Sequence, residues 1–122
     1  MIRTGETPME IKIYNKYEDF ESVPAGTQDV NIEGNADDFF YLKMEDDSMS
    51  PDYEEGQLIL FKKQRKAKSG EVVFVTVGNS SYIRKIWYDK DFLNLIPIHE
   101  NYDKLEFTGF SLNRVKIKGV AQ

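Results

Sequence analysis

The sequence has 122 residues, the length of one domain or of one domain with a tail, which excludes a two-domain enzyme. Hydrophobic residues make up 40% of the chain and aromatic residues 13%, enough for a core that a disordered chain would lack. The formal net charge of −5 would repel a DNA phosphate backbone unless the basic residues are segregated. With no cysteine and one histidine, His99, the chain offers no disulfide framework, cysteine nucleophile, thiolate zinc site or multi-histidine site.

The N-terminal residues and the lengths of the apolar runs indicate where in the cell the protein is located. Residues 1–9 are polar and contain Gly5 and Pro8, so we expect a flexible tail or linker there. No apolar run approaches the roughly 18 residues that a membrane span needs, and the N-terminus lacks the apolar region of a signal peptide. We therefore expect a cytoplasmic protein with no membrane partner.

The next segment combines a strand with an irregular stretch. Residues 10–14 alternate polar and apolar side chains, the period of a half-buried strand. Residues 15–37 are acidic and interrupted by proline and glycine, which predicts a surface loop or arm. Residues 10–37 are thus expected to form an N-terminal strand and loop that precede a domain at 38–122.

From Phe39 onward the chain consists of short runs rich in β-branched and aromatic residues, which predict strands. The predicted strands cover residues 39–44, 58–61, 71–77, 82–88, 92–97 and 115–120. Gly78-Asn79 predicts a hairpin between the third and fourth of them. Since no long stretch has helical periodicity and no internal repeat is present, we predict a mainly β domain.

A serine stands after the predicted strand 39–44, in a segment that ends at Pro51. At such a strand end followed by a tight turn, backbone N–H groups can converge on an oxyanion, so Ser48 is a candidate nucleophile. The alternative is that Ser48 caps a short turn before Pro51. Six carboxylates within residues 45–55 are expected to form a solvated acidic turn, because they lack EF-hand spacing, and no metal site is predicted.

A succession of motifs runs from Phe39 to Val120. Its parts are Asp46-Asp47-Ser48-Met49-Ser50-Pro51, Glu55-Gly56, residues 57–61, the basic residues 62–68, Gly70-Glu71-Val72-Val73, Ile83-Arg84-Lys85-Ile86, residues 95–102 and residues 115–120. Their order and spacing resemble the C-terminal domain of LexA and lambda-type phage repressors, a domain whose core fold the type I signal peptidases share. The resemblance implies an all-β fold of short, strongly bent antiparallel strands and hairpins, and no cofactor.

Two positions depart from the family's catalytic pattern. In active members a neutral lysine takes the proton of the serine hydroxyl, and the resemblance puts Arg84 at that position, where a guanidinium keeps its proton at any accessible pH. Lys85 is the alternative base, although it would need a bulge or a one-residue slip, because strand neighbours point to opposite faces. The family's glycine two residues before the serine is Asp46, whose carboxylate opposes an oxyanion. We therefore expect self-cleavage to be weak or lost.

The family cuts its own chain at an Ala-Gly bond upstream of the serine, and Ala25-Gly26 is the matching dipeptide. At roughly 3.3 Å per extended residue, the intervening chain is long enough to fold back to Ser48. Ordinary turn composition explains the same dipeptide.

Three further features are expected to be structural. Residues 62–68 carry five positive charges and predict a solvated loop rather than a contact with DNA or an acidic partner. We expect His99 to form surface hydrogen bonds, and Trp87 and Tyr88 to pack in the core or an interface.

Two functions follow from the resemblance. The first is the C-terminal dimerisation and regulatory domain of a phage-type or LexA-like repressor. It would form a homodimer through an edge strand at Val115, Ile117 and Val120, and would reach DNA only through an N-terminal helix-turn-helix absent from this sequence. The second is an active intramolecular Ser-Lys protease of the LexA or UmuD type that cuts Ala25-Gly26. A RecA-type co-protease or an antirepressor protein would be a partner, whereas a signal peptidase would need a membrane anchor.

Overall fold

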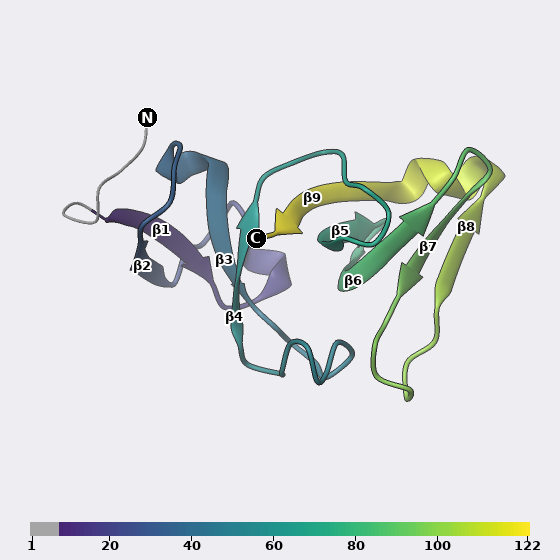
Figure 1. Ribbon diagram of the computed structural model, residues 1–122, viewed down its shortest axis with the longest axis horizontal. Coiled ribbons are helices and arrows are strands. Elements are labelled where there is room, and N and C mark those ends of the chain that lie inside the picture. The colour runs from purple at the N-terminus through teal and green to yellow at the C-terminus, as the bar shows by residue number, and fades with distance from the viewer. Residues whose placement is uncertain (1–7) are drawn as a thin grey trace.

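The structure, a computed structural model, describes residues 8–122, and its strands form one sheet (Figure 1). The elements follow one another as β1 (Met9–Tyr14), the 3-10 helix η1 (Tyr17–Asp19), β2 (Gly26–Val30), η2 (Ala36–Asp38), β3 (Phe39–Lys43), β4 (Leu58–Lys62), β5 (Val72–Val77), β6 (Ser80–Tyr88), β7 (Phe92–Ile96), β8 (Leu105–Thr108), η3 (Gly109–Arg114) and β9 (Val115–Ala121). The mainly β fold predicted from the sequence is confirmed.

The sheet has the strand order β2-β1-β3-β4-β9-β5-β6-β7-β8, so the last strand lies in its middle. Neighbouring strands are antiparallel except β1 and β3, which are parallel. In Figure 1, β1 to β4 lie on one side and β5 to β8 on the other, with β9 arching between them. Strand β9 pairs along β5, and at Val120 and Ala121 it also pairs with β4, so it joins the two halves.

The predicted strands from Phe39 onward are present, with ends that differ by one or two residues. The predicted hairpin is also present, because Val77 of β5 pairs with Ser80 of β6 across the Gly78-Asn79 turn. Gly78 has a φ of 59°, the left-handed conformation that such a two-residue turn requires.

The expectation of a loop over residues 15–37 was wrong in part, because the segment contains β2 as well as η1 and η2. Residues 26–29 are all exposed, so β2 shows no apolar alternation and is defined by its ladder with β1 alone. Met9 is also part of β1 and is buried, whereas residues 1–7 of the predicted tail lie outside the described residues. The predicted boundaries of the tail, the N-terminal strand and loop, and the domain, after residues 9 and 37, stay predictions.

Buried side chains form three clusters. The first contains stacked aromatic rings, among them Phe40 and Phe61, whose centroids are 5.3 Å apart. The second lies between β5, β6, β7 and β9, and the third lies around β1 and β3.

Trp87 and Tyr88 are 51% and 42% exposed, so the expected core packing of these two side chains is not observed. Among the described residues, no helix has the length and hydropathy needed to cross a membrane.

Candidate functional site

Ser48 lies in the loop that joins β3 to β4, and its side chain is completely buried. Two backbone hydrogen bonds close the base of this loop: the Met44 N–H donates to the Gln57 carbonyl at 2.9 Å, and the Gly56 N–H donates to the Met44 carbonyl at 2.8 Å. Gly56 has a φ of 85°, which a residue with a side chain rarely adopts. The loop therefore holds Ser48 in a fixed place.

The hydroxyl of Ser48 joins two charged side chains. Its oxygen lies 2.7 Å from Arg84 Nη1 and 2.6 Å from Asp46 Oδ1. Because a guanidinium can only donate, the serine oxygen accepts from Arg84 and its proton is donated to the Asp46 carboxylate. The Ser48 backbone N–H also donates to Asp46 Oδ1, at 3.1 Å. Both the proton and a lone pair of the hydroxyl are thus occupied.

Arg84 comes from β6, where it pairs with Val73 of β5, and it is 5% exposed. Its Nη1 also donates to the Ile83 carbonyl at 2.9 Å. The guanidinium carbon lies 5.2 Å from the ring centroid of Tyr82 and 5.6 Å from that of Tyr102, within range of cation–π attraction. A buried cation requires such compensation, because the charge has lost its hydration.

Lys85 follows Arg84 in a regular ladder, with Val73 opposite Arg84 and Val72 opposite Lys85. The register contains neither the bulge nor the slip that would turn Lys85 toward the serine. None of the hydrogen bonds that Ser48 makes within residues 8–122 involves Lys85.

The loop between β7 and β8 contacts the serine loop from the other side. The backbone N–H groups of Ile98 and His99 both donate to the Ser48 carbonyl at 2.9 Å. The Tyr102 hydroxyl donates to Asp47 Oδ1 at 2.7 Å, and His99 Nε2 lies 4.0 Å from Asp47 Oδ2. The Tyr102 hydrogen bond, together with the nearby His99, lowers the pKa of Asp47. The same hydrogen bond to Asp47 raises the pKa of Tyr102.

Tyr17 of η1 fixes the start of the serine loop. Its hydroxyl accepts the Glu45 N–H at 3.1 Å, and its own backbone N–H donates to the Glu45 carboxylate. Burial raises the pKa of Tyr17 above the ordinary range of tyrosine. No signal in the sequence pointed to Tyr17, since it lies 28 residues before its partner. Tyr82 was missed as well, although a tyrosine two residues before an arginine on a strand shares its face.

The predicted cleavage dipeptide lies in the hairpin of β1 and β2. Gly26 opens β2 opposite Ile13, and the Ala25 N–H donates to the Ile13 carbonyl at 2.7 Å. Within the part of the chain that the structure describes, Ser48 makes no hydrogen bond to either residue. Cleavage at this bond stays a prediction that this arrangement does not favour.

The remaining predicted residues are spread over the domain. Met49 is fully buried in the first cluster, whereas Pro51 is exposed. Val115 and Ile117 of β9 are half-buried against the second cluster. The prediction of an open edge at Val120 was wrong, because Val120 pairs with both Val73 and Lys62 and is 2% exposed. On the β4 side, the edge of β9 is therefore open only before Val120.

Residues 8–122 contain no group of three or more His, Asp or Glu side chains arranged to hold a metal ion. The site thus consists of a buried serine at a strand end and a basic side chain from a neighbouring strand, within a mainly β sheet. These features define a serine-peptidase-like domain.

The family comparison agrees with this class. The Peptidase S24-like family matches residues 2–122, and the chain belongs to this family. The match confirms the resemblance to LexA and phage repressors that the motifs within residues 39–120 indicated. A comparison with curated proteins gave no match.

Proposed function

We propose that the chain is the dimerisation and regulatory domain of a LexA-like or phage-type transcriptional repressor, with self-cleavage weak or lost. The observation that supports this proposal is the position of the Ser48 hydroxyl, buried and bonded to Asp46 at 2.6 Å and Arg84 at 2.7 Å.

The chemistry of peptide hydrolysis explains why this arrangement disfavours attack. A nucleophilic serine must transfer its proton to a neighbouring base while its oxygen reaches a carbonyl carbon. Arg84 cannot accept that proton. Asp46 accepts it as a hydrogen bond, and also accepts the Ser48 backbone N–H, but its negative charge would oppose an oxyanion formed beside the serine. Because Ser48 is fully buried, a scissile carbonyl also has no access to it.

A domain of this kind would act through association. Linking two DNA-reading domains raises their effective concentration at adjacent half-sites, so dimerisation alone strengthens operator binding. The reading domain would be a helix-turn-helix outside these 122 residues. A co-protease of the RecA type or an antirepressor protein would then act as the regulatory partner, in the cytoplasm.

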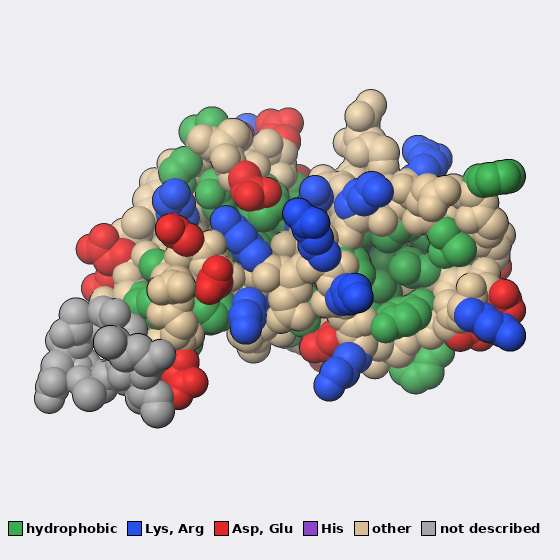
Figure 2. Space-filling view, turned by 90° about the horizontal axis from the view of Figure 1, so that it is seen from above, with side chains coloured by type: hydrophobic (Ala, Val, Ile, Leu, Met, Phe, Trp, Pro, Cys, Tyr) green, Lys and Arg blue, Asp and Glu red, His purple; other side chains and the backbone are tan. Residues whose placement is uncertain are grey.

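We place the dimer contact on the half of the sheet that contains β5 to β9. A shallow apolar depression of about 300 Å³ lies there, and we call it the apolar face; it is lined by Arg65, Lys66, Ala67, Ile86, Tyr88, Leu93 and Ile117. Figure 2 shows hydrophobic side chains gathered on this half of the molecule, with basic residues around them. Homodimer interfaces are more apolar than the rest of a protein surface, and the apolar side chains of this face give it that character.

The reactivity of Ser48 toward a fluorophosphonate probe tests the loss of catalysis. We expect no adduct on Ser48 in the native protein, because the hydroxyl is buried, is held between Asp46 and Arg84, and has no neutral lysine beside it. The double variant Asp46→Gly/Arg84→Lys removes the opposing carboxylate and supplies a base that can be neutral, so it is expected to gain a Ser48 adduct. A Ser48 adduct on the native protein, absent from Ser48→Ala, would instead support the active protease.

A further inference from the structure

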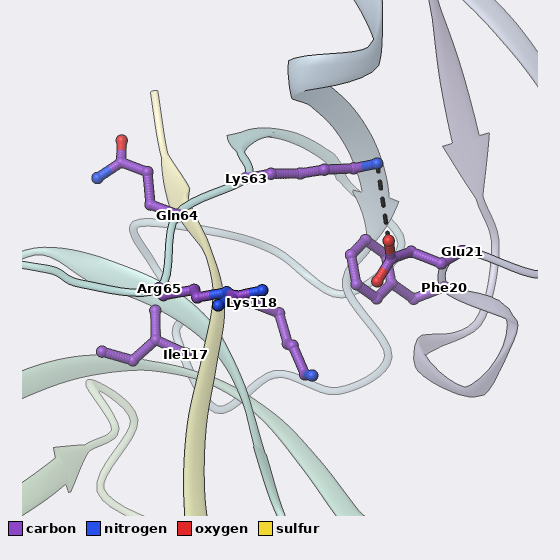
Figure 3. A pocket seen from close by; sticks show the side chains of 7 residues that line it. All are labelled: Phe20, Glu21, Lys63, Gln64, Arg65, Ile117 and Lys118. Atoms are coloured by element: carbon purple, nitrogen blue, oxygen red, sulfur yellow. Dashed lines mark ion pairs between the residues drawn. The ribbon is translucent and has the colours of Figure 1, made fainter.

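A groove separates β9 from the loop that joins β4 to β5, and we call it the basic groove. It has a volume of about 350 Å³ and is lined by Phe20, Glu21, Lys63, Gln64, Arg65, Ile117 and Lys118. Figure 3 shows Arg65 and Lys118 extending toward the gap that Phe20 and Glu21 face from the opposite side. The basic groove adjoins the apolar face, because both are lined by Arg65 and Ile117.

The cations of this groove are not all neutralised. Lys63 Nζ lies 3.8 Å from Glu21 Oε2, whereas Arg65 and Lys118 form no ion pair with any of residues 8–122. Lys116, on the same strand as Lys118, lines an adjoining depression with Arg65. Figure 2 shows lysine and arginine side chains collected along this face of a chain whose net charge is −5. The basic residues are thus segregated, which the charge total alone did not reveal.

One end of the groove already holds an aromatic residue followed by a carboxylate. Phe20 packs against Phe40 with ring centroids 4.4 Å apart, and Glu21 pairs with Lys63. Phe20 therefore forms a wall of the groove, and the Glu21–Lys63 pair shows that a carboxylate can lie at its basic rim.

The backbone of β9 adds a directional element. Its ladder with β4 covers only Val120 and Ala121, so the edge of residues 115–118, of which Ile117 and Lys118 line the groove, has no strand partner among the described residues. An unpaired edge can accept an additional strand, with main-chain hydrogen bonds giving affinity and side-chain pockets giving specificity.

We propose that the basic groove binds an acidic segment of another protein in extended conformation. Its backbone would pair with β9 before Val120, and its carboxylates would contact Arg65 and Lys118. Duplex DNA fits less well, because Glu21 within the groove would face a backbone that carries one charge per roughly 1.7 Å. The site does not depend on whether Ser48 is catalytic.

Fluorescence anisotropy with a labelled peptide that alternates glutamate and valine tests this site on the full chain. We expect saturable binding that weakens as salt is added, and much weaker binding of the peptide in which glutamine replaces glutamate. The double variant Arg65→Glu/Lys118→Glu is expected to lose about tenfold in affinity or more, equivalent to about 1.4 kcal/mol. Lys104→Glu is the matched control, because it reverses an exposed charge on the loop before β8 and should leave binding unchanged.

Three results would overturn the proposal. The first is binding of neither peptide, or equal binding by the double variant. The second is a labelled DNA duplex that binds more tightly than the acidic peptide and loses its affinity in the same double variant. The third is a change of oligomeric state, measured by sedimentation, in the single variant Lys118→Glu, which would assign the groove to a second copy of this chain, because Lys118 lines the groove but not the apolar face. Circular dichroism confirms that each variant is folded.

Discussion

At Ser48, one hydroxyl bridges two opposite charges, the partly buried carboxylate of Asp46 and the buried guanidinium of Arg84. Asp46 and Arg84 both contact its oxygen, and Arg84 is almost fully buried. A buried charge that loses its partner costs more than a neutral hydrogen bond is worth, so the serine has a structural role in addition to any chemical one.

Ser48→Ala should therefore destabilise the protein. We expect a loss of about 1–3 kcal/mol in the free energy of unfolding, because Arg84 loses a buried hydrogen bond and Asp46 a partly buried one. Urea unfolding followed by circular dichroism measures this change. Ser22→Ala is the control, since its hydroxyl is exposed and bonds only to the Asp19 carbonyl. A Ser48→Ala protein at least as stable as the native one would instead fit a serine kept for catalysis at a cost in stability.

Tyr102 should control the acidity of Asp47. Its hydrogen bond favours the ionised carboxyl and holds the pKa of Asp47 below the ordinary aspartate value. The stabilisation is therefore present above that ordinary value and is lost as the pH falls through the lowered folded-state pKa. Tyr102→Phe is expected to raise the pKa of Asp47, measured by NMR titration of the carboxyl carbon. Tyr53→Phe should leave the titration unchanged; an equal effect of both variants would contradict this assignment.

The residues of the site were predictable to different degrees. Ser48, Asp46 and Arg84 were found because their spacing matched a family pattern, and the difficulty of using Arg84 as a base follows from its chemistry alone. Tyr17 and Tyr102 could not be given roles, because their contacts join segments 28 and 55 residues apart. Such contacts depend on loop conformation, which local sequence does not specify.

Among the elements, the strands with apolar alternation or β-branched runs were predictable, since burial imposes those patterns. Strand β2 was missed because its exposed residues 26–29 carry no such pattern, and β8 because it is only four residues long. The position of β9 in the middle of the sheet was also hidden, because strand order depends on pairing between distant segments.

Close packing between β9 and the aromatic cluster gives a prediction for Gly119. A Cβ atom at this position would lie 2.7 Å from Phe40 Cζ and 3.2 Å from the Lys62 carbonyl oxygen. Gly119→Ala should therefore destabilise the protein by about 1–3 kcal/mol, measured by urea unfolding, because the stacked rings must shift. Gly26→Ala is the control, since a Cβ there meets no atom within 4 Å. Equal stability of the two variants would show that the rings move aside freely.

For the whole molecule, the proposed dimer depends on the apolar face. Ile117→Asp places a charge on that face, so we expect sedimentation velocity to show a dimer for the native protein and a monomer for this variant. Val23→Asp is the control, because Val23 is 62% exposed and does not line the face. Leu93→Asp provides a second test should Ile117→Asp fail to fold. Dimers that survive in a folded variant would place the interface elsewhere.

The surfaces illustrate why function was less predictable than fold. Composition gave a net charge of −5, but only the packing of β9 beside the loop 62–68 showed that cations gather along one groove. The family match at residues 2–122 establishes the type of domain. The proposal that self-cleavage is weak or lost rests on the departures from the family pattern at Asp46 and Arg84.

The central claim, that Ser48 is held in place rather than activated, is tested most directly by the intact mass of the purified chain. The protein would be incubated for hours at neutral and strongly alkaline pH beside Ser48→Ala. Alkali deprotonates lysine but leaves arginine charged, so it favours any hidden Ser-Lys pair. We predict one unchanged mass for both proteins at both pH values. Fragments that end at Ala25 and begin at Gly26, formed by the native protein and absent from Ser48→Ala, would contradict the account and establish a working protease.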